Sequence, residues 1–122
     1  MTGIEAARNI IENIRESAKE CYMIGVFHND PKCLTKEETL KDYAGFLEDC
    51  IGDGVFENLS GCDAAKWVLE DLSQKIRGCL AFADSYRSNG DEETADNLRV
   101  SHDAYLDYGC LLAYRLSLGA FA

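Results

Sequence analysis

A chain of 122 residues with an ordinary apolar content is long enough to bury a core as one domain, so neither disulfides nor a metal is needed to hold it together. One proline and ten glycines argue against a low-complexity or disordered chain. The formal net charge of -10, from 22 acidic and 12 basic side chains, disfavours direct binding to DNA or RNA, because a phosphate-binding surface is basic.

The N-terminal part of the chain predicts a helix near residues 3–25. Thr2 and Glu5 form a capping box, and apolar residues then recur every three or four positions. The stretch HNDP at 28–31 predicts a turn, because proline pushes the residue before it out of helical geometry.

A second, shorter helix is expected near residues 36–51. Thr35 and Glu38 form another capping box, apolar residues follow at helical spacing, and the glycines within 52–54 predict the end of the helix.

The second half of the chain predicts two longer helices, near 62–88 and 92–117, separated by a tight turn at SNGD. Apolar residues follow helical spacing through both segments, and no stretch alternates as a strand would. The sequence therefore predicts a single all-α domain, a compact antiparallel four-helix bundle.

Two stretches share the pattern C-x3-G-V-F-x-N-x3-C: CYMIGVFHNDPKC at 21–33 and CIGDGVFENLSGC at 50–62. Each glycine falls where a left-handed helix cap is expected, so we interpret the match as two helix ends that are capped alike. A duplicated helix-and-cap unit is an alternative, although a stacked repeat needs about three copies. A metal site of four thiolates, from Cys21, Cys33, Cys50 and Cys62, is a second alternative, but these cysteines lack the close pairs in sequence that are typical of zinc sites. We expect reduced, metal-free thiols that act as small buried hydrophobes.

His102 lies on the apolar face of the last predicted helix, one turn from Tyr105. No partner at the spacing of a known catalytic motif accompanies it, and neither histidine follows a glutamate by three residues, as a di-iron bundle requires. We therefore predict no catalytic residue, metal or cofactor. An internal polar site around His102, Tyr105 and the cysteines, binding a small molecule or metal, is the alternative function.

The acidic side chains are concentrated in two groups. Seven lie between Glu48 and Asp71 with Lys66 as the only base, and others run from the start of the fourth helix to Asp107. Acids also cap and solubilise ordinary helices, but such a surface favours a basic protein partner. Because charges set specificity more than affinity, an apolar anchor is needed beside them. The predicted partner-binding residues are Glu48, Asp49, Asp53, Phe56, Glu57, Asp63, Trp67, Glu70, Asp71, Asp103, Asp107 and Tyr108.

The C-terminal half of the fourth helix is apolar on almost every side, which is typical of a central helix or of an interface. With only four helices to cover it, we expect part of this segment to contact another chain, either a partner or a second copy in a homodimer.

The N-terminus lacks the basic start and apolar core of a signal peptide, and the apolar-rich stretch at 109–122 is too short to cross a bilayer. We therefore expect a cytoplasmic protein. In kind, a small acidic helical chain without recognised motifs resembles phage-encoded inhibitors of host defence, including anti-CRISPR proteins, an analogy that carries over no residues. The predicted function is a non-enzymatic inhibitor that occupies the basic nucleic-acid-binding surface of its target.

Overall fold

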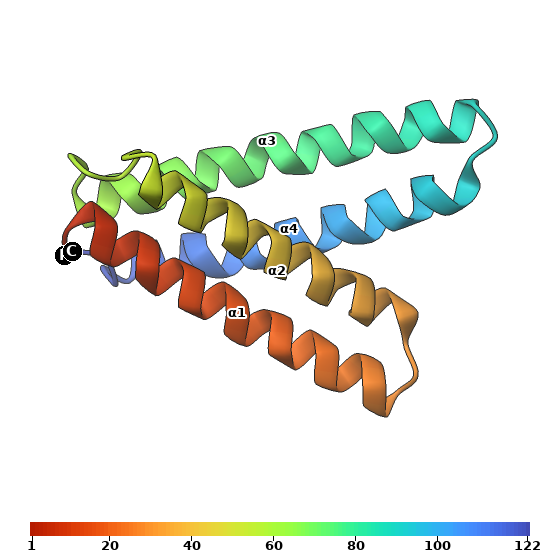
Figure 1. Cartoon of the computed structure of the whole chain (residues 1–122), viewed down its shortest axis with the longest axis horizontal. Coiled ribbons are helices and arrows are strands. Elements are labelled where there is room, and N and C mark those ends of the chain that lie inside the picture. Colours follow the sequence, from red (N-terminus) through yellow and green to blue (C-terminus); the bar gives the residue numbers. More distant parts are fainter.

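The computed structural model describes all 122 residues and consists of four α-helices joined by turns. The helices are α1 (Gly3–Phe27), α2 (Pro31–Gly52), α3 (Gly61–Ser88) and α4 (Glu92–Ser117). Helix α1 packs against α2, and α3 packs against α4, so the chain forms two antiparallel helical hairpins (Figure 1). This arrangement confirms the predicted all-α four-helix bundle.

The two hairpins pack together most closely at one end of the molecule and diverge towards the other (Figure 1). We call the first the closed end; it holds both chain termini and the turn at 53–60. There the amino group of Met1 donates to the Ala122 carbonyl at 3.0 Å, and the Gly61 amide donates to the Met1 carbonyl at 2.9 Å. The α1–α2 and α3–α4 turns lie apart at the opposite, open end.

The core contains apolar side chains from all four helices, because each helix places them at three- and four-residue spacing on one face. Two further aromatic side chains, Phe56 from the 53–60 turn and Phe121 beyond α4, belong to the same core. Among the most completely buried side chains are Ile10, Ile14, Tyr43, Leu47, Val68, Leu72 and Leu112. None of the four helices combines the length and the apolar content that a membrane crossing requires.

The starts of α1 and α2 test the two capping boxes predicted from the sequence. At α1 the predicted box is confirmed: the Glu5 amide donates to Thr2 Oγ1, and the Thr2 amide donates to Glu5 Oε1, both at 3.1 Å. Helix α2 begins at Pro31 rather than 36, because Asp30 accepts a hydrogen bond from the Lys32 amide at 3.0 Å. Proline at the first helical position lacks an N–H that would be unpaired there in any case. The predicted cap at Thr35 is therefore wrong.

The two matching stretches fold differently, so their interpretation as a shared cap is wrong. Gly25 lies inside α1, where an added Cβ would come 2.7 Å from Leu34 Cδ2, whereas Gly54 has the left-handed φ of 82°. The left-handed residue after α1 is instead Asn29. The phenylalanines differ as well, because Phe27 is 80% exposed and Phe56 is fully buried.

Candidate protein-binding site

Four exposed carboxylates surround the 53–60 turn at the closed end of the bundle. Asp49 lies in the last turn of α2, Asp53 caps that helix, Glu57 is in the turn, and Asp63 lies in the first turn of α3. None of these carboxylates forms a salt bridge within the chain. We call this set the acidic end.

The position of two of these carboxylates is electrostatically unfavourable. Asp49 and Asp53 lie at the C-terminus of α2, where the helix dipole is negative, and the last turn of α2 contains no basic residue. Asp63 is the opposite case, because it lies at the positive N-terminus of α3. The helix dipole therefore accounts for the position of Asp63, but not for the positions of Asp49 and Asp53.

The backbone of the turn is held from several sides. The Gly3 amide donates to the Leu59 carbonyl at 2.8 Å, and the Val55 amide donates to the Cys50 carbonyl at 3.1 Å. Phe56 packs edge-on against Trp67, with ring centroids 5.1 Å apart. The acidic end is thus presented by a turn that is anchored to α1, α2 and α3.

The other three acids between Glu48 and Asp71 are paired with neighbouring bases. Glu48 contacts Arg15 of α1 at 2.9 Å. Glu70 lies 4.0 Å from Arg77 on the same helix. Asp71 is largely covered: it lies 3.7 Å from Lys75 and accepts a hydrogen bond of 2.7 Å from the Tyr43 hydroxyl, whose pKa is raised by burial and by this bond. These three carboxylates are less available to a partner than the acidic end.

The predicted acids on α4 are also paired. Asp107 contacts Lys36 of α2 at 3.3 Å, and Asp103 lies 2.9 Å from the ring of His102. Near the start of α4, Arg87 bridges Glu92 at 2.9 Å and Asp96 at 2.8 Å.

The acids at the start of α4 lie far from the acidic end. The start of α4 is at the open end, and the acidic end lies beside the start of α3 (Figure 1). The 28 residues of α3 separate them by about 42 Å at a rise of 1.5 Å per residue.

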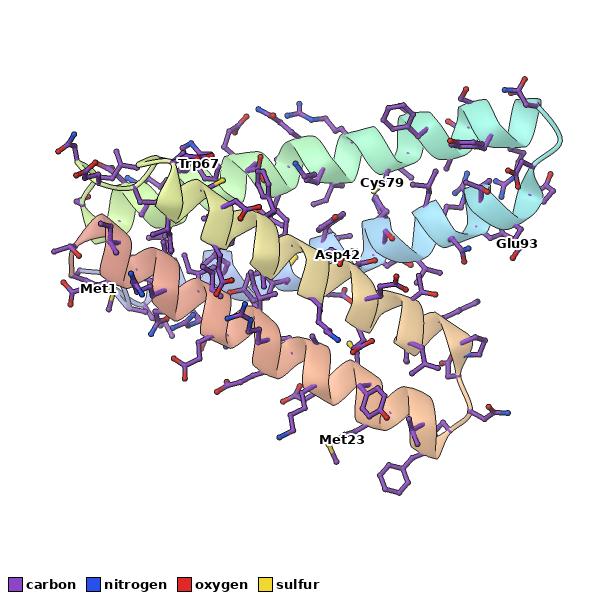
Figure 2. All side chains as sticks on the ribbon, viewed as in Figure 1. Met1, Met23, Asp42, Trp67, Cys79 and Glu93 are labelled. Carbon is purple, nitrogen blue, oxygen red and sulfur yellow. The ribbon has the colours of Figure 1, made fainter.

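Two of the three predicted aromatic anchors belong to the core, so their assignment to a binding surface is wrong. Phe56 is fully buried and Tyr108 is 3% exposed. The Tyr108 hydroxyl donates to Asn13 Oδ1 at 3.1 Å, and burial raises its pKa. Trp67 is half-buried in α3, near the 53–60 turn (Figure 2). Of the three, only Trp67 keeps an exposed part beside the acidic end.

The alternative internal site is assembled only in part. Burial raises the pKa of Tyr105 to about 12, and its ring packs edge-on against Tyr43 at 5.6 Å. Cys79 is buried on α3 and contributes to this rise in the Tyr105 pKa. The His102 ring bonds instead to Asp103 on its own helix. The three side chains form no hydrogen-bonded cluster.

The cysteines of the matching stretches are too far apart for a four-thiolate site. Cys33 and Cys50 lie on α2 seventeen residues apart, which is about 25 Å along a helix. No three histidine, cysteine, aspartate or glutamate side chains gather in a metal-binding arrangement. Burial raises the pKa of the Cys21, Cys50 and Cys79 thiols, which lowers their reactivity.

The structure exposes an apolar surface that the sequence analysis missed. We call it the apolar tip; it lies at the end of α1 by the α1–α2 turn and comprises Tyr22, Met23, Ile24, Val26 and Phe27, which are 48–80% exposed. A signal was present: Cys21 to Asn29 contains no acidic, lysine or arginine residue, and apolar residues on every side cannot all face one core.

The fold and the site define a four-helix bundle with an unpaired acidic end. No protein-family model, no curated protein and no solved structure matches this chain. The function is therefore inferred from the site itself.

Proposed function

We propose that this protein is a non-enzymatic, protein-binding inhibitor whose acidic end contacts a basic surface on its target. The observation that carries the proposal is the position of Asp49 and Asp53, two exposed carboxylates without ion pairs at the negative end of a helix. A lysine or arginine from a partner would stabilise them there. Glu57 and Asp63 extend the same surface across the turn.

The target that fits this chemistry is a protein with a nucleic-acid-binding groove. Such grooves carry lysines and arginines that hold phosphates, and carboxylates form equally strong charge-assisted hydrogen bonds with them. Asp49 and Asp53 are one helical turn apart, about 6 Å along the axis, so both can engage one groove. The proposed biological setting is inhibition of a host-defence effector, as anti-CRISPR proteins do.

The acidic end has few apolar groups beside its charges. Only the exposed part of Trp67 offers an aromatic contact beside the acidic end, because Phe56 and Tyr108 are core residues. The apolar tip is at the other end of α1, about 37 Å away along 25 residues. We therefore expect binding to weaken steeply as salt rises, since exposed charge pairs are screened.

The experiment is affinity capture from a lysate of the native host, with bound proteins identified by mass. The wild-type protein is expected to retain a nucleic-acid-binding protein. The triple variant Asp49→Lys, Asp53→Lys, Glu57→Lys should lose it, because attraction to the basic groove becomes repulsion.

The matched control is the triple variant Glu16→Lys, Glu20→Lys, Glu38→Lys, which changes the net charge by the same amount. These three acids are also exposed and without ion pairs, but they lie away from the acidic end. This variant should retain the target. Equal loss in both variants would show that total charge matters and the acidic end does not.

A further inference from the structure

The outward face of the α3–α4 hairpin carries a shallow apolar groove of about 190 Å³. Its lining residues recur every three or four positions on both helices, as in a helix-packing surface. They include Leu69 and Ile76 of α3 and Leu106, Gly109, Cys110 and Ala113 of α4.

This groove is a second apolar face on helices that already bury one. The core face of α4 contains Ala104, Tyr108 and Leu112, all buried, whereas Leu106 on the groove side is 43% exposed and Cys110 is exposed. A helix that is apolar on two sides either lies inside a fold or packs against another chain. Only the first side of α4 is covered within this chain.

The charges that flank the groove are balanced, although the whole protein carries -10. There are three bases and three acids, and all six are exposed. Of the six, five lie three, four or seven residues from a lining residue, and Asp84 lies eleven residues, about three helical turns, from Ser73. Lys75 and Asp107 have a similar spacing, but they contact Phe46 and Lys36 of α2, respectively, and so are not counted with the groove. Within one chain, Arg99 pairs with Asp84 at 3.5 Å, and Glu70 pairs with Arg77 at 4.0 Å. The six are Lys66, Glu70, Arg77, Asp84, Arg99 and Asp103.

The order of these charges along α3 is self-complementary. The sequence of signs is positive at Lys66, negative at Glu70, positive at Arg77 and negative at Asp84. If a second α3 runs antiparallel across the first, Lys66 lies opposite the second copy's Asp84, and Glu70 opposite its Arg77. Both pairings place the two-fold axis near the same point, residues 73–75. A surface that pairs with itself in this way has the property that a two-fold interface requires.

We propose that this face binds a second copy of the chain, so that two α3–α4 hairpins pack across a two-fold axis as an intermolecular four-helix layer. From Lys66 to Asp84 the face is about 27 Å long, and its width is that of two helices, about 20 Å. The contact would therefore bury roughly 1,100 Å², counted over both copies. That area reaches the ~1,000 Å² expected of a biological interface. Ser73, Gly109 and Ala113 leave room for close helix packing. The two acidic ends then point in opposite directions.

Sedimentation equilibrium of the purified protein tests this proposal. The wild type is expected to show twice the 13.5 kDa mass of one chain. Leu106→Glu should give the monomer mass, because it places a carboxylate in the centre of the contact. Leu111→Glu is the matched control: Leu111 is 39% exposed on the same helix but lies outside the groove, so this variant should remain dimeric.

A charge exchange tests the antiparallel register with the fold intact, because both side chains are on the surface. Glu70→Arg alone and Arg77→Glu alone should each raise the dimer dissociation constant about tenfold, since two contacts per dimer become repulsive. The double exchange should restore wild-type affinity. A wild-type chain that stays monomeric at its highest soluble concentration would overturn the proposal, as would equal dissociation of the Leu106 and Leu111 variants.

Discussion

Replacing Phe56 with alanine is expected to lower the free energy of unfolding by about 3–5 kcal/mol, because the ring is fully buried between the turn and Trp67. That loss is a large part of the 5–15 kcal/mol by which a typical domain is stable. Urea denaturation followed by circular dichroism measures it directly. The result distinguishes a core role for Phe56 from the surface anchor that the sequence predicts.

Phe27→Ala is the matched control for this experiment. Phe27 is 80% exposed at the apolar tip, so removing its ring should change the free energy of unfolding by only about 0.5 kcal/mol. Equal stability of the two variants would place Phe56 outside the core and return it to the candidate binding residues.

Gly3→Ala is the second substitution with a large expected effect on stability. A Cβ at this position would lie 2.5 Å from the Phe56 carbonyl oxygen and 2.6 Å from that of Leu59, both backbone atoms of the 53–60 turn. The turn and α1 would have to move apart, so we expect a destabilisation of about 1–3 kcal/mol in the same urea experiment.

Gly45→Ala should have the opposite sign. Gly45 lies within α2, and a Cβ there meets no atom within 4 Å, so alanine stabilises the helix by about 0.5–1 kcal/mol. If both glycine variants were stabilising, the close approach of α1 to the turn would be incorrect.

The helices could be predicted from the sequence because their signals are local. The predicted bounds 92–117 are those of α4 in the structure, and the predicted bounds 62–88 differ from those of α3 by one residue. The start of α2 was missed because two caps compete within six residues. Asp30 followed by Pro31 prevails, since proline has the φ that the first helical position needs.

The candidate site was predicted less well, because ion pairs depend on packing between helices. The pairs Arg15–Glu48 and Lys36–Asp107 join residues 33 and 71 positions apart, and no local pattern indicates them. Sequence counts therefore identified seven acids between Glu48 and Asp71 without separating the paired ones from the acidic end. Burial of Phe56 and Tyr108 was missed for a similar reason, since either aromatic could have faced a partner.

The exposure of the apolar tip follows from the divergence of the two hairpins. At the closed end each hairpin covers the other, but near the α1–α2 turn α1 is left with α2 alone (Figure 1). Periodicity indicates which residues share a face of α1. It does not indicate how far along α1 the second hairpin continues to cover that face.

In the proposed function, the acidic end occupies a surface of the partner that otherwise holds nucleic acid. Displacement of labelled nucleic acid from the captured partner tests it most directly, with the fluorescence anisotropy of the label as the signal. We expect the wild type to release the nucleic acid, less efficiently as salt rises, and the Asp49, Asp53, Glu57 triple variant to leave it bound. A ternary complex, in which the partner holds protein and nucleic acid together, would show that the acidic end binds elsewhere on the partner.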